Sequence, residues 1–332
     1  MTVDERSHGV LDYMNTVDLE FLRDSAREFL TGRGEKDSLT ELAGMDWTGL
    51  LVDESLGGAG WRPVEATVVA EELGRAGDRS TWLGAVVAAA ALESAPAEIR
   101  ERWLGGVLAG AAPSAVALGG DTVRVIGADS LRVLITLGSN GIQLFEISDR
   151  VPRTRDDELL EVSRPAWRVE LAGTDGVAIG GPQRAEQLLA VARVLLSADS
   201  LGALSRTFAR LVAYLKERIA FGAPIASFQA VQHRLVDLLV LEAKARAVTM
   251  KAARALARAD LTADATALSA TAHAFVASKA TAAVDECMQL SGGIGFTWEY
   301  PLHHELRRTF TNGHLLGSAR TSRADLAEKA GW

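Results

Sequence analysis

The chain has 332 residues, of which 48% are hydrophobic and 23% charged, a balance typical of a folded soluble protein with one to three domains. Its 43 acidic residues exceed its 35 basic ones, giving a net charge of −8, which argues against nucleic acid or an anionic membrane as a partner. A single cysteine, Cys287, excludes an internal disulfide, and the six histidines show no metal-ligand spacing.

The hydropathy pattern predicts neither insertion into a membrane nor export. No apolar run approaches the length of a membrane span. The first six residues are polar and acidic, unlike a secretory signal. The sequence therefore predicts a cytoplasmic protein.

Helical periodicity dominates from about residue 16 to 105. Apolar residues at helical spacing over 19–29 give one buried face. A glycine-rich breaker follows, and then Pro63, which suits the first turn of a helix. An alanine-rich helix is expected over 83–92. Residues 1–113 are therefore predicted to form an N-terminal helical domain.

Between residues 114 and 182 the hydrophobic period shortens to two, which is typical of half-buried strands. Asn140 and Gly141 lie between two such runs, and because both residue types accept positive φ they predict a hairpin turn. A further strand is expected over 167–171. This segment is predicted to be a small middle β domain.

Long helical segments return at residue 183 and continue to residue 332 with short breaks. They predict an antiparallel four-helix bundle, so the fold class is α+β, mainly α. Periodicity alone favours a plain bundle without a ligand. The predicted helices are 183–219, 227–257, 262–290 and 301 onward.

The break between the first two of these helices carries an unusual set of side chains. Arg218 ends a helix, Phe221 and Gly222 turn the chain, and Phe228 and Gln229 begin the next helix. A cation at a helix C-terminus is favoured by the helix dipole, so capping alone accounts for the arginine. It does not account for the aromatic residues and the amide in fixed register. An arginine fork, an aromatic face and an amide together suit a nucleotide.

A second break follows Gln289, where Gly292 and Gly293 end a helix. A glycine pair in this position is usually a C-cap that needs positive φ. It also leaves backbone N–H groups open to close approach, as a pyrophosphate requires.

Together the two breaks resemble the R-x-x-F-G-x-x-I-x-x-F-Q and Q-x-x-G-G-x-G-[FY]-x-x-[ED]-x-P turns of the acyl-CoA dehydrogenase family. The stretch Gly-Leu-Leu-Val-Asp-Glu-Ser-Leu-Gly-Gly over 49–58 resembles part of the family's N-terminal helical domain. The resemblance implies dehydrogenation of an acyl-CoA thioester with FAD, whose ADP end is held across a subunit interface. The FAD contacts that it implies are Arg218, Phe221, Phe228, Gln229, Gln289, Gly292 and Gly293.

The family's flavin-ring motif, T-E-P-x-x-G-S-D followed by a W-I-[TS] strand, is missing. Residues 110–124 read Gly-Ala-Ala-Pro-Ser-Ala-Val-Ala-Leu-Gly-Gly-Asp-Thr-Val-Arg instead. Since the resemblance assigns the flavin ring and the thioester to that motif, the middle domain is predicted to be shortened where its own ring pocket should be.

The family's catalytic carboxylate is missing as well. It takes the α-proton of the thioester while the β-hydride passes to the flavin. The two positions where relatives carry it fall on Leu316 and Ala192, so no catalytic residue is assigned. Asp199 and Glu242, on neighbouring helices, are the candidate substitutes, although a solvated or paired carboxylate is the commoner role.

By the resemblance, the FAD-contact motifs that this chain keeps and the flavin-ring motif that it lacks lie on two sides of one subunit interface. This pattern favours a short, catalytically silent subunit that shares FAD with a longer homologous subunit in an α2β2 heterotetramer. Such subunits resemble those of actinobacterial dehydrogenases that act on CoA thioesters of steroid side chains. Three alternatives stay open: a homomeric dehydrogenase with a relocated base, a flavin-free scaffold or interaction protein, and a flavin oxidase or monooxygenase on the same fold.

Overall fold

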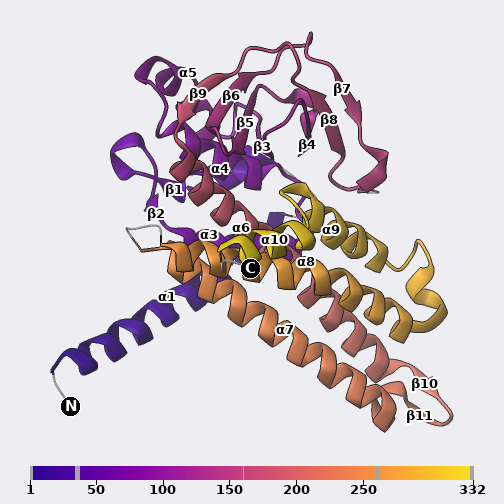
Figure 1. Cartoon of the computed structure of the whole chain (residues 1–332). Coiled ribbons are helices and arrows are strands. Elements are labelled where there is room, and N and C mark those ends of the chain that lie inside the picture. The colour runs from indigo at the N-terminus through magenta and orange to yellow at the C-terminus, as the bar shows by residue number, and fades with distance from the viewer. Residues whose placement is uncertain (1–2, 34–37, 160, 259–261, 330–332) are drawn as a thin grey trace.

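The computed structural model describes residues 3–33, 38–159, 161–258 and 262–329. Helices come first along the chain, then two small sheets, then long helices again (Figure 1). The predicted fold class, α+β and mainly α, is confirmed.

One of the N-terminal helices, α4, is almost entirely alanine, valine and leucine and is buried along most of its length. Pro63 lies in the first turn of α3, as predicted, because its missing N–H has no helical partner to lose there. A two-stranded hairpin, β1 with β2, joins α2 to α3. The elements are α1 (Val3–Arg33), α2 (Leu39–Ala43), β1 (Leu51–Val52), β2 (Gly60–Trp61), α3 (Pro63–Ala76), α4 (Trp82–Leu92) and α5 (Ala97–Leu108).

The middle of the chain forms a four-stranded sheet, ordered β3-β5-β6-β9, and a three-stranded sheet, ordered β4-β8-β7. Apolar side chains of both sheets pack against each other, and the other face of the larger sheet packs on α4 and α6. The strands are β3 (Ser114–Leu118), β4 (Thr122–Ile126), β5 (Val133–Gly138), β6 (Gly141–Glu146), β7 (Arg153–Arg155), β8 (Ala166–Glu170) and β9 (Val177–Gly180).

The predicted hairpin joins β5 to β6, with Gly138 paired to Gly141. Its positive φ, +99°, falls on Gly141 and not on Asn140. The hairpin is confirmed, and the strand expected at 167–171 is β8.

The C-terminal half contains α6 (Pro182–Glu217), α7 (Gln229–Leu256), α8 (Ala263–Ser291), α9 (Leu302–Leu315) and α10 (Ala319–Lys329). The first three begin and end within two residues of their predicted bounds. The single last helix of the predicted bundle is wrong: the chain turns at Gly317, whose φ is +92°, so two helices form there.

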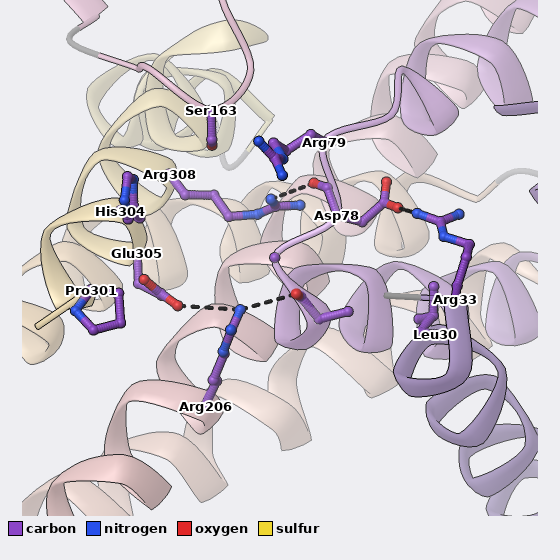
Figure 2. Close-up of a pocket in the computed structure, with 12 residues that line it drawn as sticks. Leu30, Arg33, Asp78, Arg79, Ser163, Arg206, Pro301, His304, Glu305 and Arg308 are labelled. Atoms are coloured by element: carbon purple, nitrogen blue, oxygen red, sulfur yellow. Dashed lines mark hydrogen bonds and ion pairs between the residues drawn. The ribbon is translucent and has the colours of Figure 1, made fainter. Parts of the chain in front are cut away.

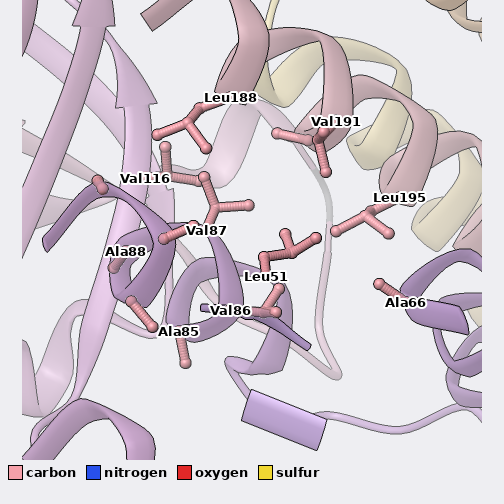
Figure 3. Close-up of a cluster of buried hydrophobic side chains, with 14 of the residues drawn as sticks. Leu51, Ala66, Ala85, Val86, Val87, Ala88, Val116, Leu188, Val191 and Leu195 are labelled. Atoms are coloured by element: carbon pink, nitrogen blue, oxygen red, sulfur yellow. The ribbon is translucent and has the colours of Figure 1, made fainter. Parts of the chain in front are cut away.

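Helix α6 is the centre of the molecule. Its apolar side chains Leu188, Val191 and Leu195 face the cluster around α4 (Figure 3). A Cβ added at Gly202 would lie 1.8 Å from the carbonyl oxygen of Glu71, so α6 and α3 touch through their backbones.

This helix also corrects one expectation from the sequence. By length and composition α6 could cross a membrane, contrary to the prediction that no segment is apolar enough. Since 94% of its most apolar stretch is buried inside the protein, its hydrophobicity is explained by its place in the core.

Candidate functional site

The turn after α6 is a tight hairpin that exposes an aromatic ring. Strands β10 (Ile219–Ala220) and β11 (Ala223–Pro224) pair, and Phe221 and Gly222 lie at the tip with φ of +52° and +79°. Positive φ at both tip residues is the requirement of a type I′ turn, which glycine meets easily and phenylalanine does not. The strained Phe221 is also 99% exposed, so packing within this chain does not explain it.

Arg218 immediately precedes this hairpin. Its backbone is fixed, because its N–H donates to the Tyr214 carbonyl and its own carbonyl accepts from the Ile225 N–H, both at 2.9 Å. Its side chain is exposed. Within the described part of the chain, no hydrogen bond or ion pair engages this guanidinium. The helix end therefore presents an open fork to an anion from outside.

The start of α7 lies beside the hairpin. Phe228 is the N-cap residue of α7 and Gln229 its first residue. The ring of Phe228 stands edge-on to that of Phe221, with centroids 6.3 Å apart. Gln229 is exposed. The four residues predicted from the first motif thus lie on one outward-facing turn.

The second predicted segment closes α8. Gly292 is its C-cap with φ of +69°, which favours glycine, and Gln289 is exposed one turn earlier. A Cβ at Gly295 would lie 2.4 Å from the Met288 carbonyl oxygen, so packing fixes that glycine. Neither reason applies to Gly293, which lacks positive φ and has open space around its Cβ position. A group approaching from outside would account for it.

The two segments lie at the same end of the helical region, since α6 and α8 end there while α7 and α9 begin there (Figure 1). The rings of Tyr214, at the end of α6, and Tyr300, before α9, lie 5.9 Å apart. Cys287 is in the apolar cluster beneath them, and burial raises the pKa of its thiol to about 12. The thiol is therefore a packing residue.

The space beside Leu316, where the resemblance implies a catalytic carboxylate, is small. A cavity of about 50 Å³ lies there, lined by Leu196, Leu315, Leu316 and neighbouring residues of α4, β3 and β4. Sites for organic ligands usually measure about 300–1,000 Å³. Leu316 is 1% exposed and Ala192 is fully buried in α6. The side chains described here do not fit a flavin ring and a thioester.

Asp199, one of the two candidate bases, is held in a buried ion pair. Arg308 donates to its two carboxylate oxygens at 2.7 and 2.5 Å, and Asn312 donates at 2.6 Å. Arg164 lies 3.7 Å away. Burial alone would raise the pKa of this carboxyl, but the charges of Arg308 and Arg164 and the hydrogen bonds outweigh it and lower the pKa. A carboxylate so engaged is a poor proton acceptor.

Glu242 is engaged in the same way. It accepts hydrogen bonds from Ser205 at 2.7 Å and from Arg246 at 3.0 Å. Arg246 also binds Glu71 of α3, at 2.9 Å. Both substitute carboxylates are therefore part of the internal packing. No group of three or more His, Cys, Asp and Glu side chains within the described ranges could hold a metal ion.

Comparison with known proteins agrees with this architecture. The N-terminal domain model of the acyl-CoA dehydrogenase family matches residues 16–111, and the C-terminal domain model matches residues 180–331. The acyl-CoA dehydrogenase IpdE2 of Mycobacterium tuberculosis is 32% identical over 271 residues, which are 82% of this chain and 79% of that protein. The chain belongs to the acyl-CoA dehydrogenase family.

Solved structures of this family superimpose on nearly the whole chain. A variant of the Tcur3481–Tcur3483 steroid acyl-CoA dehydrogenase has a TM-score of 0.78 and 26% identity, and the match covers 95% of this chain and 98% of that one. The ChsE4–ChsE5 complex of Mycobacterium tuberculosis has the same TM-score of 0.78, with coverage of 95% and 96%. Its 23% identity shows the fold alone.

The variant Leu316→Glu places a carboxylate at one of the two positions where the resemblance implies the catalytic one. It is expected to gain no dehydrogenase activity in the isolated chain supplied with FAD and acyl-CoA, because the surrounding cavity admits no flavin ring. It should also lower the free energy of unfolding by about 2 kcal/mol or more, since a carboxylate would be buried at a position that is 1% exposed. Dye-reduction assays and urea unfolding measure the two effects. Leu316→Met is the size-matched control. Turnover by Leu316→Glu would contradict the inference that this cavity is too small for a flavin ring.

Proposed function

We propose that this acyl-CoA dehydrogenase chain is the base-less subunit of a heteromeric, FAD-dependent enzyme, in which it supplies the ADP-side half of the FAD site to a longer homologous subunit. One contrast carries the proposal. The turn around Arg218 and Phe221 faces outward with its cation and its ring unpacked, while the chain's own ring pocket is filled by Leu316.

The residues at this end of the helical region suit an adenosine diphosphate group. The guanidinium of Arg218 would hold the diphosphate, and the backbone N–H groups around Gly293 allow its close approach. Phe221, Gln229 and Gln289 would contact the adenosine. When bound, FAD supplies the hydride acceptor of the reaction. This chain's own part is to bind and orient it.

Proton transfer in such an enzyme falls to the partner. The reaction needs a carboxylate within hydrogen-bond reach of the α-carbon. In this chain Leu316 and Ala192 cannot accept a proton, and Asp199 and Glu242 are held in ion pairs. We therefore place the base, the flavin-ring contacts and the acyl-CoA thioester on the longer subunit.

Exposed apolar side chains support a protein partner over this face. A soluble monomer seldom leaves a large contiguous apolar patch uncovered. The exposed fractions are 57% for Ile219, 57% for Phe296 and 70% for Trp298 around the two turns. Along the outer side of α7, the exposed apolar residues are Val236, Leu239 and Val240.

The substrate proposal rests on the relatives. The Tcur3481–Tcur3483 protein, 26% identical, is a steroid acyl-CoA dehydrogenase named for two chains. By that likeness we propose a CoA thioester of a steroid side chain as the substrate and an α2β2 assembly as the active form. The lone buried thiol of Cys287 suits a reducing cytoplasm.

The visible absorption spectrum and the native mass test this proposal directly. The chain would be purified alone and after co-expression with a longer acyl-CoA dehydrogenase from the same genome. Flavin absorption is expected only in the mixed assembly. Stoichiometric flavin in the chain alone would overturn the half-site proposal. A mixed assembly without flavin would favour the scaffold alternative instead.

A further inference from the structure

The cavity where α1, α6 and α9 meet has charges that the packing of the chain explains (Figure 2). Arg33, from α1, pairs with Asp78. Arg206, from α6, lies 3.5 Å from Glu305 of α9. Arg308 binds the buried carboxylate of α6 described above. Because these charges have partners within the chain, the cavity needs no ligand to account for them. The outer face of α7 differs in this respect.

Helix α7 has two unlike faces. Its inner face packs on α6 and α8 and includes the buried residues Leu238 and Ala245. Its outer face is exposed, and α7 runs along the outside of the helical region (Figure 1). Val236, Leu239 and Val240 lie exposed on this outer face. Packing within the described part of the chain does not cover these three apolar side chains.

The apolar residues of the outer face are arranged by size. The larger ones, Val236, Leu239 and Val240, come first, and two exposed alanines, Ala243 and Ala247, follow them. Steps of three and four residues keep all five on one side of a helix. We call these five residues the α7 stripe. One half of the stripe is raised by its larger side chains and the other half is flat.

Two copies of the α7 stripe fit each other when they pack antiparallel about a two-fold axis. If the axis passes between residues 240 and 241, the regular rise of the helix puts Val236 of one copy midway between the levels of Ala243 and Ala247 of the other. Each valine then enters the space beside two small side chains. Leu239 and Val240 meet their own counterparts near the axis.

The charges beside the stripe agree with the same axis. Asp237 and Lys244 are exposed and lie on one edge of the outer face, since seven residues make nearly two turns. Within the described ranges, no hydrogen bond or ion pair engages either side chain. They lie equally far from the axis on opposite sides, so Asp237 of each copy comes level with Lys244 of the other. The size pattern and the charge pattern therefore indicate the same self-complementary contact.

We propose that the outer face of α7 binds a second copy of this chain in an antiparallel, two-fold-symmetric contact. The proposal rests on the proposed function for the α2β2 assembly, in which it supplies the direct link between the two copies of this chain. The contact itself can be tested without FAD. The stripe starts about two turns beyond Gln229, so FAD and the second copy would engage different residues.

Sedimentation velocity of the full-length chain alone, over about a hundredfold range of concentration, tests the proposal. We expect a reversible dimer of moderate affinity, because one pair of helices buries less than the about 1,600 Å² of a standard interface. A monomer at every concentration would overturn the proposal. Flavin in the mixed assembly is measured separately, so a failure of the FAD proposal would leave this result unaffected.

A charge exchange makes the test specific. Asp237→Lys and Lys244→Asp each place like charges opposite one another at two symmetry-related positions, so each should weaken dimerisation about tenfold or more. The double variant Asp237→Lys with Lys244→Asp restores opposite charges and should recover most of the affinity. Lys251→Asp is the matched control. It changes an exposed lysine seven residues further along the same edge, which comes level with Ala230 of the second copy, and should leave the affinity nearly unchanged.

Each outcome of the charge exchange decides for or against the second copy. These positions are exposed, so the variants are expected to fold normally. Single variants that dimerise as the unaltered chain does, or a double variant that recovers nothing, would contradict the proposed contact. If the charge changes weaken only the binding of the longer subunit, the α7 stripe belongs to that subunit and the second-copy proposal is wrong.

Discussion

Replacing Arg218 with alanine is expected to weaken FAD binding by the mixed assembly about 30- to 4,000-fold, which corresponds to about 2–5 kcal/mol. The fork has no partner within the described part of this chain, so its removal costs the subunit itself almost nothing. The loss would come from a desolvated diphosphate left without its cation. Flavin retained after gel filtration and a fluorescence titration with FAD measure the effect.

Two control variants distinguish bidentate binding by the Arg218 guanidinium from a general effect of positive charge. Lys216→Ala removes an exposed cation two residues earlier on the same helix end and should leave FAD affinity nearly unchanged. Arg218→Lys keeps the charge but not the bidentate geometry, so an intermediate affinity is expected. Native mass should be the same in all three variants. Unchanged flavin occupancy in Arg218→Ala would remove this residue from the site.

The helices could be predicted because their periodicity is long and uninterrupted. Helices α6, α7 and α8 each exceed 25 residues, and capping and burial agree with the pattern along them. The last helix was predicted less well, since Gly317 reads as a tolerable glycine in a helical pattern and the structure uses it as a left-handed turn.

The residues of the candidate site also differ in how well the sequence predicts them. The FAD turns are local in sequence, so a motif could place Arg218 beside Phe221 and Gln229. The role of Asp199 could not be read from its neighbours on α6. Its partners Arg164 and Arg308 lie 35 residues before it and 109 residues after it. The packing of α9 against α6 brings Arg308 to it, and the segment before β8 brings Arg164.

Asp199→Asn is expected to be the most destabilising of these substitutions. It would leave Arg308 and Arg164 buried without their shared carboxylate, at a cost of about 3–5 kcal/mol in the free energy of unfolding. Urea unfolding of the full-length chain measures this cost. If Asp199 were instead a catalytic base, the variant would keep its stability and the mixed assembly would lose turnover.

The difference in the free energy of unfolding between the unaltered chain and Asp199→Asn should depend on pH, and this dependence identifies its cause. Because the pKa of Asp199 is lower in the folded chain than in the unfolded one, the ion pair contributes its full stability above the unfolded value, about 3.9. That contribution is lost as the pH falls through the folded pKa. The stability gap between the unaltered chain and Asp199→Asn should therefore be constant near neutral pH and narrow below about pH 4. The double variant Asp199→Leu with Arg308→Met should recover part of the loss, because it removes the unpaired charge of Arg308, while Arg164 keeps Glu161 at 3.6 Å. A gap that does not change with pH would assign the loss to packing rather than to the charge of this carboxylate.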